Sequence, residues 1–115
     1  MSKRRDPELL EDIVGSIDRI GIFTKNMDYP AFLRDIKTQD AVIRNLEIIG
    51  EAVKNISPNL KSQHKDIDWK NIAGMRDKIA HFYFGVNWDI VWPTIKSNLP
   101  ILDKKLREIL RNQKQ

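Results

Sequence analysis

Apolar residues recur every three or four positions along most of the chain, and this spacing predicts amphipathic helices. The first such segment follows Asp6-Pro7-Glu8, where we expect Asp6 to be the N-cap and the proline to occupy the first helical position. The pattern fades from Thr24 onward, so this helix should end there. Its apolar stripe consists of Leu9, Leu10, Ile13, Val14, Ile17, Ile20 and Phe23.

The longest periodic segment runs from about Thr38 to Ser57, and Pro58 should end it. A short piece over residues 29–36 precedes it. Residues 58–66 are rich in polar side chains, and we interpret them as a loop in which the isolated His64 is solvent-exposed and has no role. The main stripe of the long helix is Val42, Ile43, Leu46, Ile49, Gly50, Val53 and Ile56.

Two further helices are expected between residues 68 and 97. Asp68 can cap the segment "WKNIAGMRDKIAHFYF", which Gly85 should end. Asn87 can cap "WDIVWPTIKS", inside which Pro93 should kink or shorten the helix.

Asn98 and Leu99-Pro100 should begin a last helix, which runs into a polar tail at about residues 111–115. Helices with short connections pack as antiparallel neighbours. We therefore expect residues 1–115 to form one all-α domain, a compact antiparallel bundle of four to five helices.

The composition supports a helical globular protein and excludes several kinds of site. The 115 residues are 41% hydrophobic and 31% charged. Cysteine is absent, which excludes disulfides, a thiol nucleophile and thiolate metal ligands. The histidines at 64 and 81 are too far apart in sequence for a short helical metal motif, so we expect no metal and no cofactor.

The formal net charge of +4 is compatible with a nucleic-acid partner, but many ordinary domains carry as much. The basic N-terminal residues are not followed by the apolar run of a signal peptide, and no stretch reaches the ~18 apolar residues of a membrane span. We expect a cytoplasmic protein without a membrane partner.

The segment "RDKIAHFY", residues 76–83, places four polar groups on an otherwise apolar helix. Arg76 and Tyr83 lie seven residues apart on one flank of the core stripe. Asp77 and His81 lie four apart on roughly the opposite side, so the carboxylate can accept a hydrogen bond from the imidazole. The core stripe itself is Ile72, Met75, Ile79, Phe82 and Val86.

The arc between these two polar pairs holds Ala73, Ala80 and Phe84, which predicts a second packing face. A second copy of the chain is the simplest partner, because a two-fold homodimer sets the same helix on both sides of a groove. Arg44 and Glu51 could belong to that groove, or form an ordinary surface ion pair.

Arg76, His81 and Tyr83 spell R-x4-H-x-Y, which resembles the motif of HEPN ribonucleases and, more narrowly, of their HepT branch, formerly DUF86. The similarity extends in the same order over "QDAVIRNLEIIGEA" at 39–52, "IDWKNIAGMRDKIAHFYFGVNWDIVW" at 67–92 and "NLP" at 98–100.

The resemblance implies a homodimeric HEPN-like bundle in which two motif copies line one cleft. Active members are metal-independent endoribonucleases and serve as toxins of type VII-like toxin–antitoxin systems. Their antitoxin is a minimal nucleotidyltransferase that adds AMP to the motif tyrosine, here Tyr83. Arg76 and His81 would then be catalytic, with Asp77, where the branch often has asparagine, orienting the histidine.

These residue types suit RNA cleavage without a metal. Histidine exchanges protons near neutral pH, and arginine stabilises the phosphoryl charge that builds as the 2′-OH attacks. Tyr83 could instead simply cap the core, and Trp69, Trp88 and Trp92 could stack on bases but are more often packing anchors. The competing interpretations are a non-catalytic HEPN module that binds nucleotide or RNA beside a nucleotidyltransferase, and a plain helical dimerisation domain.

Overall fold

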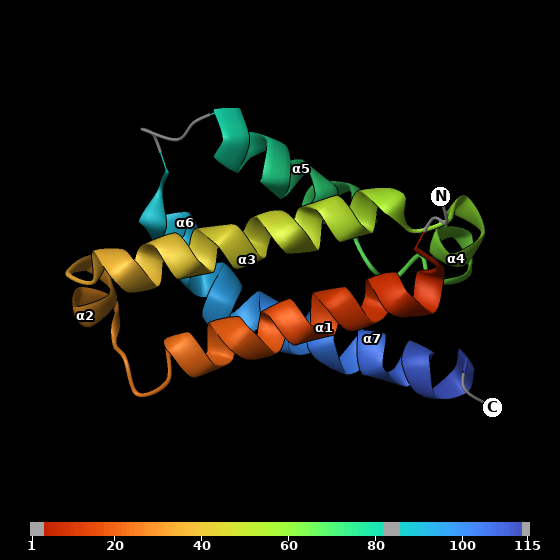
Figure 1. The fold of residues 1–115 in the computed structure, drawn as a ribbon, viewed down its shortest axis with the longest axis horizontal. Helices are drawn as coiled ribbons and strands as arrows, with labels where there is room; N and C mark the ends of the chain where they lie inside the picture. Colours follow the sequence, from red (N-terminus) through yellow and green to blue (C-terminus); the bar gives the residue numbers. More distant parts are fainter. Residues whose placement is uncertain (1–3, 82–85, 114–115) are drawn as a thin grey trace.

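The computed structural model describes residues 4–81 and 86–113, with the backbone alone at residues 76 and 78–81. All secondary structure in this part of the chain is helical, which confirms the predicted all-α class (Figure 1). The elements are α1 (Asp6–Phe23), α2 (Tyr29–Leu33), α3 (Ile36–Asn55), α4 (Pro58–Gln63), α5 (Trp69–His81), α6 (Trp88–Pro93), the π-helical turn η2 (Thr94–Asn98) and α7 (Leu99–Gln113).

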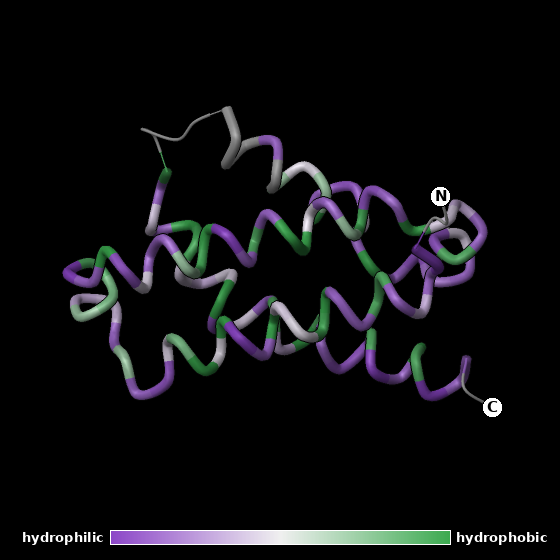
Figure 2. Tube along the Cα trace, in the orientation of Figure 1, coloured by the Kyte–Doolittle hydropathy of each residue, from purple (hydrophilic) through white to green (hydrophobic). Residues whose placement is uncertain are grey.

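The long helix α3 lies at the centre of the bundle, with α1 packed along one side and α5 along another, while α7 packs on α1 (Figure 1). The chain reverses direction between α1 and α3 and again between α3 and α5, so these neighbours are antiparallel. Figure 2 shows hydrophobic and hydrophilic residues alternating along each long helix, as expected when one face is buried. Core side chains with no solvent exposure include Leu10, Ile13, Phe32, Val42, Leu46, Ile49 and Leu106.

The start of α1 differs from the predicted cap. Arg5 occupies the N-cap position without a side-chain hydrogen bond, and Asp6 is the first helical residue. The Asp6 carboxylate accepts hydrogen bonds from the backbone N–H of Ser57 at 2.9 Å and from its hydroxyl at 2.6 Å. The prediction of Asp6 as N-cap was wrong because this carboxylate pairs with a residue distant in sequence.

The predicted loop at 58–66 was also wrong in part, because α4 forms there. Ser57 caps it by accepting a hydrogen bond from Leu60 N–H, and Pro58 fits its first position because the proline φ angle is already helical. Leu60 is buried against the core at 5% exposure. His64 is half-buried and not fully exposed, and its carbonyl accepts a hydrogen bond from Trp69 Nε1 at 3.0 Å.

Helix α3 begins two residues before the predicted start because Asp35 caps it, accepting a hydrogen bond from Thr38 N–H at 3.0 Å. That hydrogen bond is the main reason why the pKa of Asp35 lies below its usual value. At the far end α3 stops at Asn55, before Pro58, as the sequence indicated.

The predicted effect of Pro93 is confirmed: α6 ends at this residue, and η2 separates it from α7. Proline has no N–H for the regular helical hydrogen bond, and the residues after it form a π-helical turn, in which hydrogen bonds span five residues instead of four. The Asn87 cap is confirmed by its hydrogen bond from Asp89 N–H at 3.0 Å. Asn98 belongs to η2, and α7 continues to Gln113, into the residues expected to form a tail.

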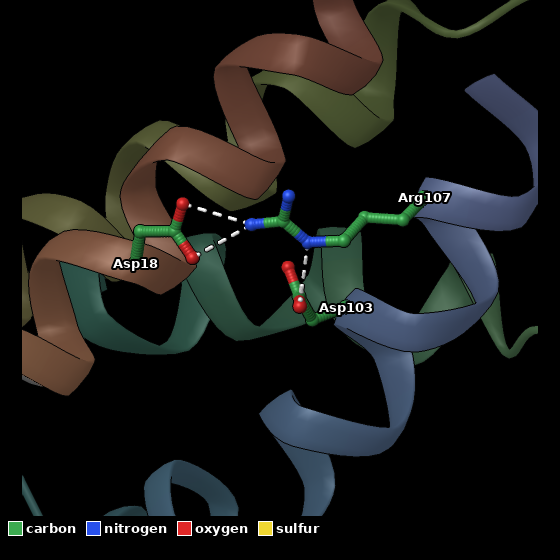
Figure 3. Close-up of polar contacts among 3 residues, drawn as sticks. All are labelled: Asp18, Asp103 and Arg107. Carbon is green, nitrogen blue, oxygen red and sulfur yellow. Dashed lines mark hydrogen bonds and ion pairs between the residues drawn. The ribbon is translucent and has the colours of Figure 1, made fainter. Parts of the chain in front are cut away.

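An arginine joins the first and last helices (Figure 3). Arg107 Nη2 on α7 lies 2.8 Å from both carboxylate oxygens of Asp18 on α1, and its Nε lies 2.9 Å from Asp103 one turn earlier. Hydrogen bonds to Asp103 and to Asp18 raise the pKa of the Arg107 guanidinium, and the bond to Asp103 contributes more.

Aromatic side chains tie α2 to α6. The ring of Phe32 lies 5.3 Å from that of Trp88 and 4.9 Å from that of Trp92, measured between centroids. The Tyr29 hydroxyl donates a hydrogen bond to Asp89. This packing places the start of α6 next to α2, and it supports the interpretation of Trp88 and Trp92 as packing anchors.

Candidate functional site

Helix α5 carries the polar segment singled out in the sequence. Asp68 caps its start, as predicted, by accepting hydrogen bonds from the backbone N–H of Asn71 at 3.2 Å and from its side-chain amide at 2.6 Å. Trp69 anchors the first turn at 7% exposure, and Ile72 and Met75 pack half-buried against the core. These contacts fix which face of α5 is turned away from the bundle.

The backbone positions of Arg76, Asp77 and His81 all lie on α5, as the periodicity indicated. The side chains of Arg76 and His81 and the whole of Tyr83 lie outside the described residues. Their predicted roles therefore stay predictions. Of the four polar residues singled out in this segment, Asp77 is the one whose side chain the structure describes.

Asp77 faces α3. Lys54 Nζ, in the last turn of α3, lies 3.5 Å from Asp77 Oδ1. Both side chains are partly exposed, at 44% for Lys54 and 47% for Asp77, so solvent reaches the pair. The ammonium of Lys54 offsets part of the negative charge that Asp77 brings to this part of α5.

Sequence reasoning did not single out Lys54. It lies 23 residues before Asp77, and lysine near a helix C-terminus has an ordinary explanation in the helix dipole. The pair depends on how α3 and α5 pack, and no local spacing in the sequence encodes that contact.

Arg44 and Glu51 line a shared hollow on the α1 side of α3, together with Glu47, Ile48 and Arg4. Whether these side chains face a second copy of the chain stays a prediction. Trp69 lies in the core cluster with its indole N–H bonded to a backbone carbonyl, which supports a packing role over base stacking.

Within residues 4–81 and 86–113, no group of three or more histidine, aspartate or glutamate side chains is arranged to hold a metal ion. No helix in that part of the chain has the length and apolar character needed to cross a membrane.

Comparison with known proteins adds independent information. Residues 13–109 match the family model described as ribonuclease HepT-like. A relative from Thermococcus cleftensis, named "Probable ribonuclease HepT", is 47% identical over 107 residues, which cover 93% of this chain and 97% of the relative. No solved structure gives a significant match.

Two candidate RNases show similar likeness. One from Methanocaldococcus jannaschii is 43% identical over 112 residues, covering 97% of each chain. Another, from Caldanaerobacter subterraneus, is 42% identical over 106 residues, covering 92% of this chain and 91% of the relative. Each of the three alignments spans nearly the full length of both aligned chains.

Proposed function

The chain belongs to the ribonuclease HepT-like family, and we propose that it is a metal-independent endoribonuclease acting as the toxin of a type VII-like toxin–antitoxin pair. The observation that carries this proposal is the family match over residues 13–109, which includes the R-x4-H-x-Y segment. Family membership supports ribonuclease activity and an RNA substrate; the mechanism and partners are the finer part of the proposal.

In the proposed reaction the ribose 2′-oxygen attacks the adjacent phosphorus while the bond from phosphorus to the 5′-oxygen breaks. His81 of one protomer takes the 2′-OH proton, and the same histidine of the second protomer, in its protonated form, gives a proton to the leaving 5′-oxygen. The products are a 2′,3′-cyclic phosphate and a 5′-hydroxyl. Since one imidazole serves one role at a time, two copies are needed, which supports a homodimer.

Arg76 is proposed to bind the phosphoryl oxygens, whose charge increases in the transition state. Asp77 is proposed to orient the His81 ring from one helical turn away. The contact with Lys54 is compatible with a carboxylate at this position, because a neighbouring cation lowers the electrostatic cost of keeping it beside the proposed phosphate site.

Tyr83 is proposed as the residue to which a minimal nucleotidyltransferase antitoxin adds AMP. The added group would bring an anion and an adenine next to Arg76 and so exclude RNA. Co-expression with the partner enzyme should add mass in AMP units to the wild type but not to Tyr83→Phe. Addition at another residue would overturn this assignment.

Cleavage of total RNA with EDTA present tests the catalytic proposal. His81→Ala and Arg76→Ala should each reduce the rate by about 10² or more, because each removes a group that acts in the transition state. His64→Ala is the matched control, since its histidine lies in the α4–α5 connection, and it should keep wild-type activity.

An RNA with a single 2′-deoxy substitution at the cleaved position should resist the wild type, since it lacks the nucleophile. Full activity in His81→Ala, or loss of activity on adding EDTA, would refute the mechanism. RNA binding without any cleavage would instead favour the non-catalytic HEPN module.

A further inference from the structure

Four lysines from three neighbouring helices and one connection line a single groove of about 740 Å³. Lys54 lies in the last turn of α3, Lys61 lies on α4, Lys65 lies in the connection after α4, and Lys70 lies in the first turn of α5. Figure 1 shows why they meet: the end of α3, all of α4 and the start of α5 lie at the same end of the bundle.

The groove is cationic. Two aspartates also line it, so the four lysines leave it with a formal charge of +2. Both carboxylates are engaged elsewhere: Asp66 pairs with Lys105 at 3.3 Å, and Asp68 caps α5. Among the described side chains, Lys61, Lys65 and Lys70 form no ion pair, so their charges are available to an anionic ligand.

The groove leads toward the motif. Lys70, Ala73 and Asp77 follow one another at helical spacings of three and four residues and so share one face of α5. Position 81 is one turn further along that face. From Lys70 to Asp77 the helix rises about 10 Å. Lys54 joins the two regions, because it lines the groove and contacts Asp77.

We propose that this lysine groove binds the phosphate backbone of the RNA strand on one side of the cleaved bond and guides that strand to α5. The inference rests on the proposed ribonuclease function. Lysine ammonium groups bind phosphates as point charges and read no base edges. Trp69, the aromatic residue in the lining, is too buried to stack on bases, so the groove should bind without sequence preference.

The test compares two triple variants with the same loss of charge. Lys61→Gln/Lys65→Gln/Lys70→Gln removes the groove cations. Lys25→Gln/Lys37→Gln/Lys104→Gln removes three exposed lysines outside the groove. Both are made in the His81→Ala background, so that a fluorescent single-stranded RNA stays intact. Kd is measured by anisotropy over a series of salt concentrations, and circular dichroism checks that each variant is folded.

Each phosphate contact contributes about 0.7 to the slope of log Kd against log salt for a single strand. The slope should therefore be about 2 smaller for the groove variant than for the parent, and the groove variant should bind RNA more weakly. The control variant should keep the parent slope. Single substitutions at Lys61 or Lys65 should each remove about 0.7. With His81 restored, the groove variant should show a raised KM and an unchanged kcat.

Equal slopes for the parent and the groove variant would overturn the inference, as would an equal loss in the control variant. These binding measurements are independent of catalysis. If the wild type fails to cleave RNA, the proposed function fails while the slopes still decide whether the groove binds the backbone. If the wild type cleaves and the slopes are equal, the proposed function stands without the groove.

Discussion

The ammonium of Lys54 lies 3.5 Å from the carboxylate of Asp77, although the two residues are 23 positions apart. Lys54 lies in the last turn of α3, and Asp77 directly follows Arg76 on α5. Half-exposed ion pairs contribute only about 0.5 kcal/mol to stability. The pair therefore contributes more to the local charge next to position 76 than to stability, because Lys54 offsets part of the charge of Asp77.

Lys54→Gln should lower kcat/KM for RNA about tenfold, since the variant removes a cation that offsets part of the Asp77 charge beside the proposed phosphate site. Its free energy of unfolding should change by less than about 0.5 kcal/mol. Steady-state cleavage and chemical denaturation measure the two quantities. Lys37→Gln, which loses the same charge at the start of α3, should behave as wild type.

A double-mutant cycle checks that the effect passes through Asp77. Adding Asp77→Asn to Lys54→Gln should restore most of the activity, because the amide carries no charge and its oxygen can still accept a hydrogen bond. Strictly additive effects of the two substitutions would show that Lys54 acts on RNA without Asp77.

Arg107→Gln should lower the free energy of unfolding by about 1 kcal/mol, because it removes a cation shared by two carboxylates on α1 and α7. The loss should shrink at high salt, which screens this exposed network. Denaturant titrations at low and high salt measure both effects. Lys104→Gln, with the same change in charge on α7, is the control, and an equal loss there would contradict a specific role for the arginine.

Tyr29 should ionise at an unusually high pH. Its hydrogen bond to Asp89, more than any other cause, raises the pKa of the Tyr29 hydroxyl to about 12. The unfolded-state pKa is about 10, so the stability from this bond is fully present below pH ~10 and is lost as the pH rises toward 12. Tyrosinate absorbance in a Tyr83→Phe background follows Tyr29 alone.

In that titration Asp89→Ala should return the tyrosine transition toward pH ~10, since the acceptor is gone. A transition near 10 in the presence of Asp89 would mean that the hydrogen bond is not maintained in solution.

Ser16→Ala should stabilise the protein by about 1 kcal/mol. The Ser16 side chain is fully buried on α1, and its hydroxyl has no hydrogen-bond partner among the described residues. Alanine removes the desolvated hydroxyl and has the higher helix propensity. Thermal unfolding measures the change, and a lower Tm would indicate that the hydroxyl has a partner in solution, such as a buried water.

The sequence predicted the elements whose signals are local. Most residues of the α1 and α3 stripes are buried where the periodicity indicated, and Asp68 and Asn87 cap their helices through neighbours two or three residues away. Phe23, at the end of the predicted α1 stripe, is instead 39% exposed, because α1 ends there. Pro93 ends α6 because its effect on the backbone is intrinsic to the residue.

The wrong predictions concern contacts between distant residues. Asp6 was predicted to be a cap, but its carboxylate accepts hydrogen bonds from Ser57, which is 51 positions away in the sequence. Residues 58–63 looked like a loop because their composition is polar, yet one buried leucine and a serine cap make them helical. Lys54 could not be found for the same reason, since only the packing of α3 on α5 brings it to Asp77.

The two hydrogen bonds that Ser57 donates to the Asp6 carboxylate also matter for protein production. Ser57 caps α4, and α4 supplies Lys61 to the lysine groove, so the sixth residue supports a surface that is distant from it in the sequence. An expression clone trimmed past Asp6 would lose that support. We expect such a truncation to weaken the proposed RNA contact at the lysine groove while leaving α5 intact.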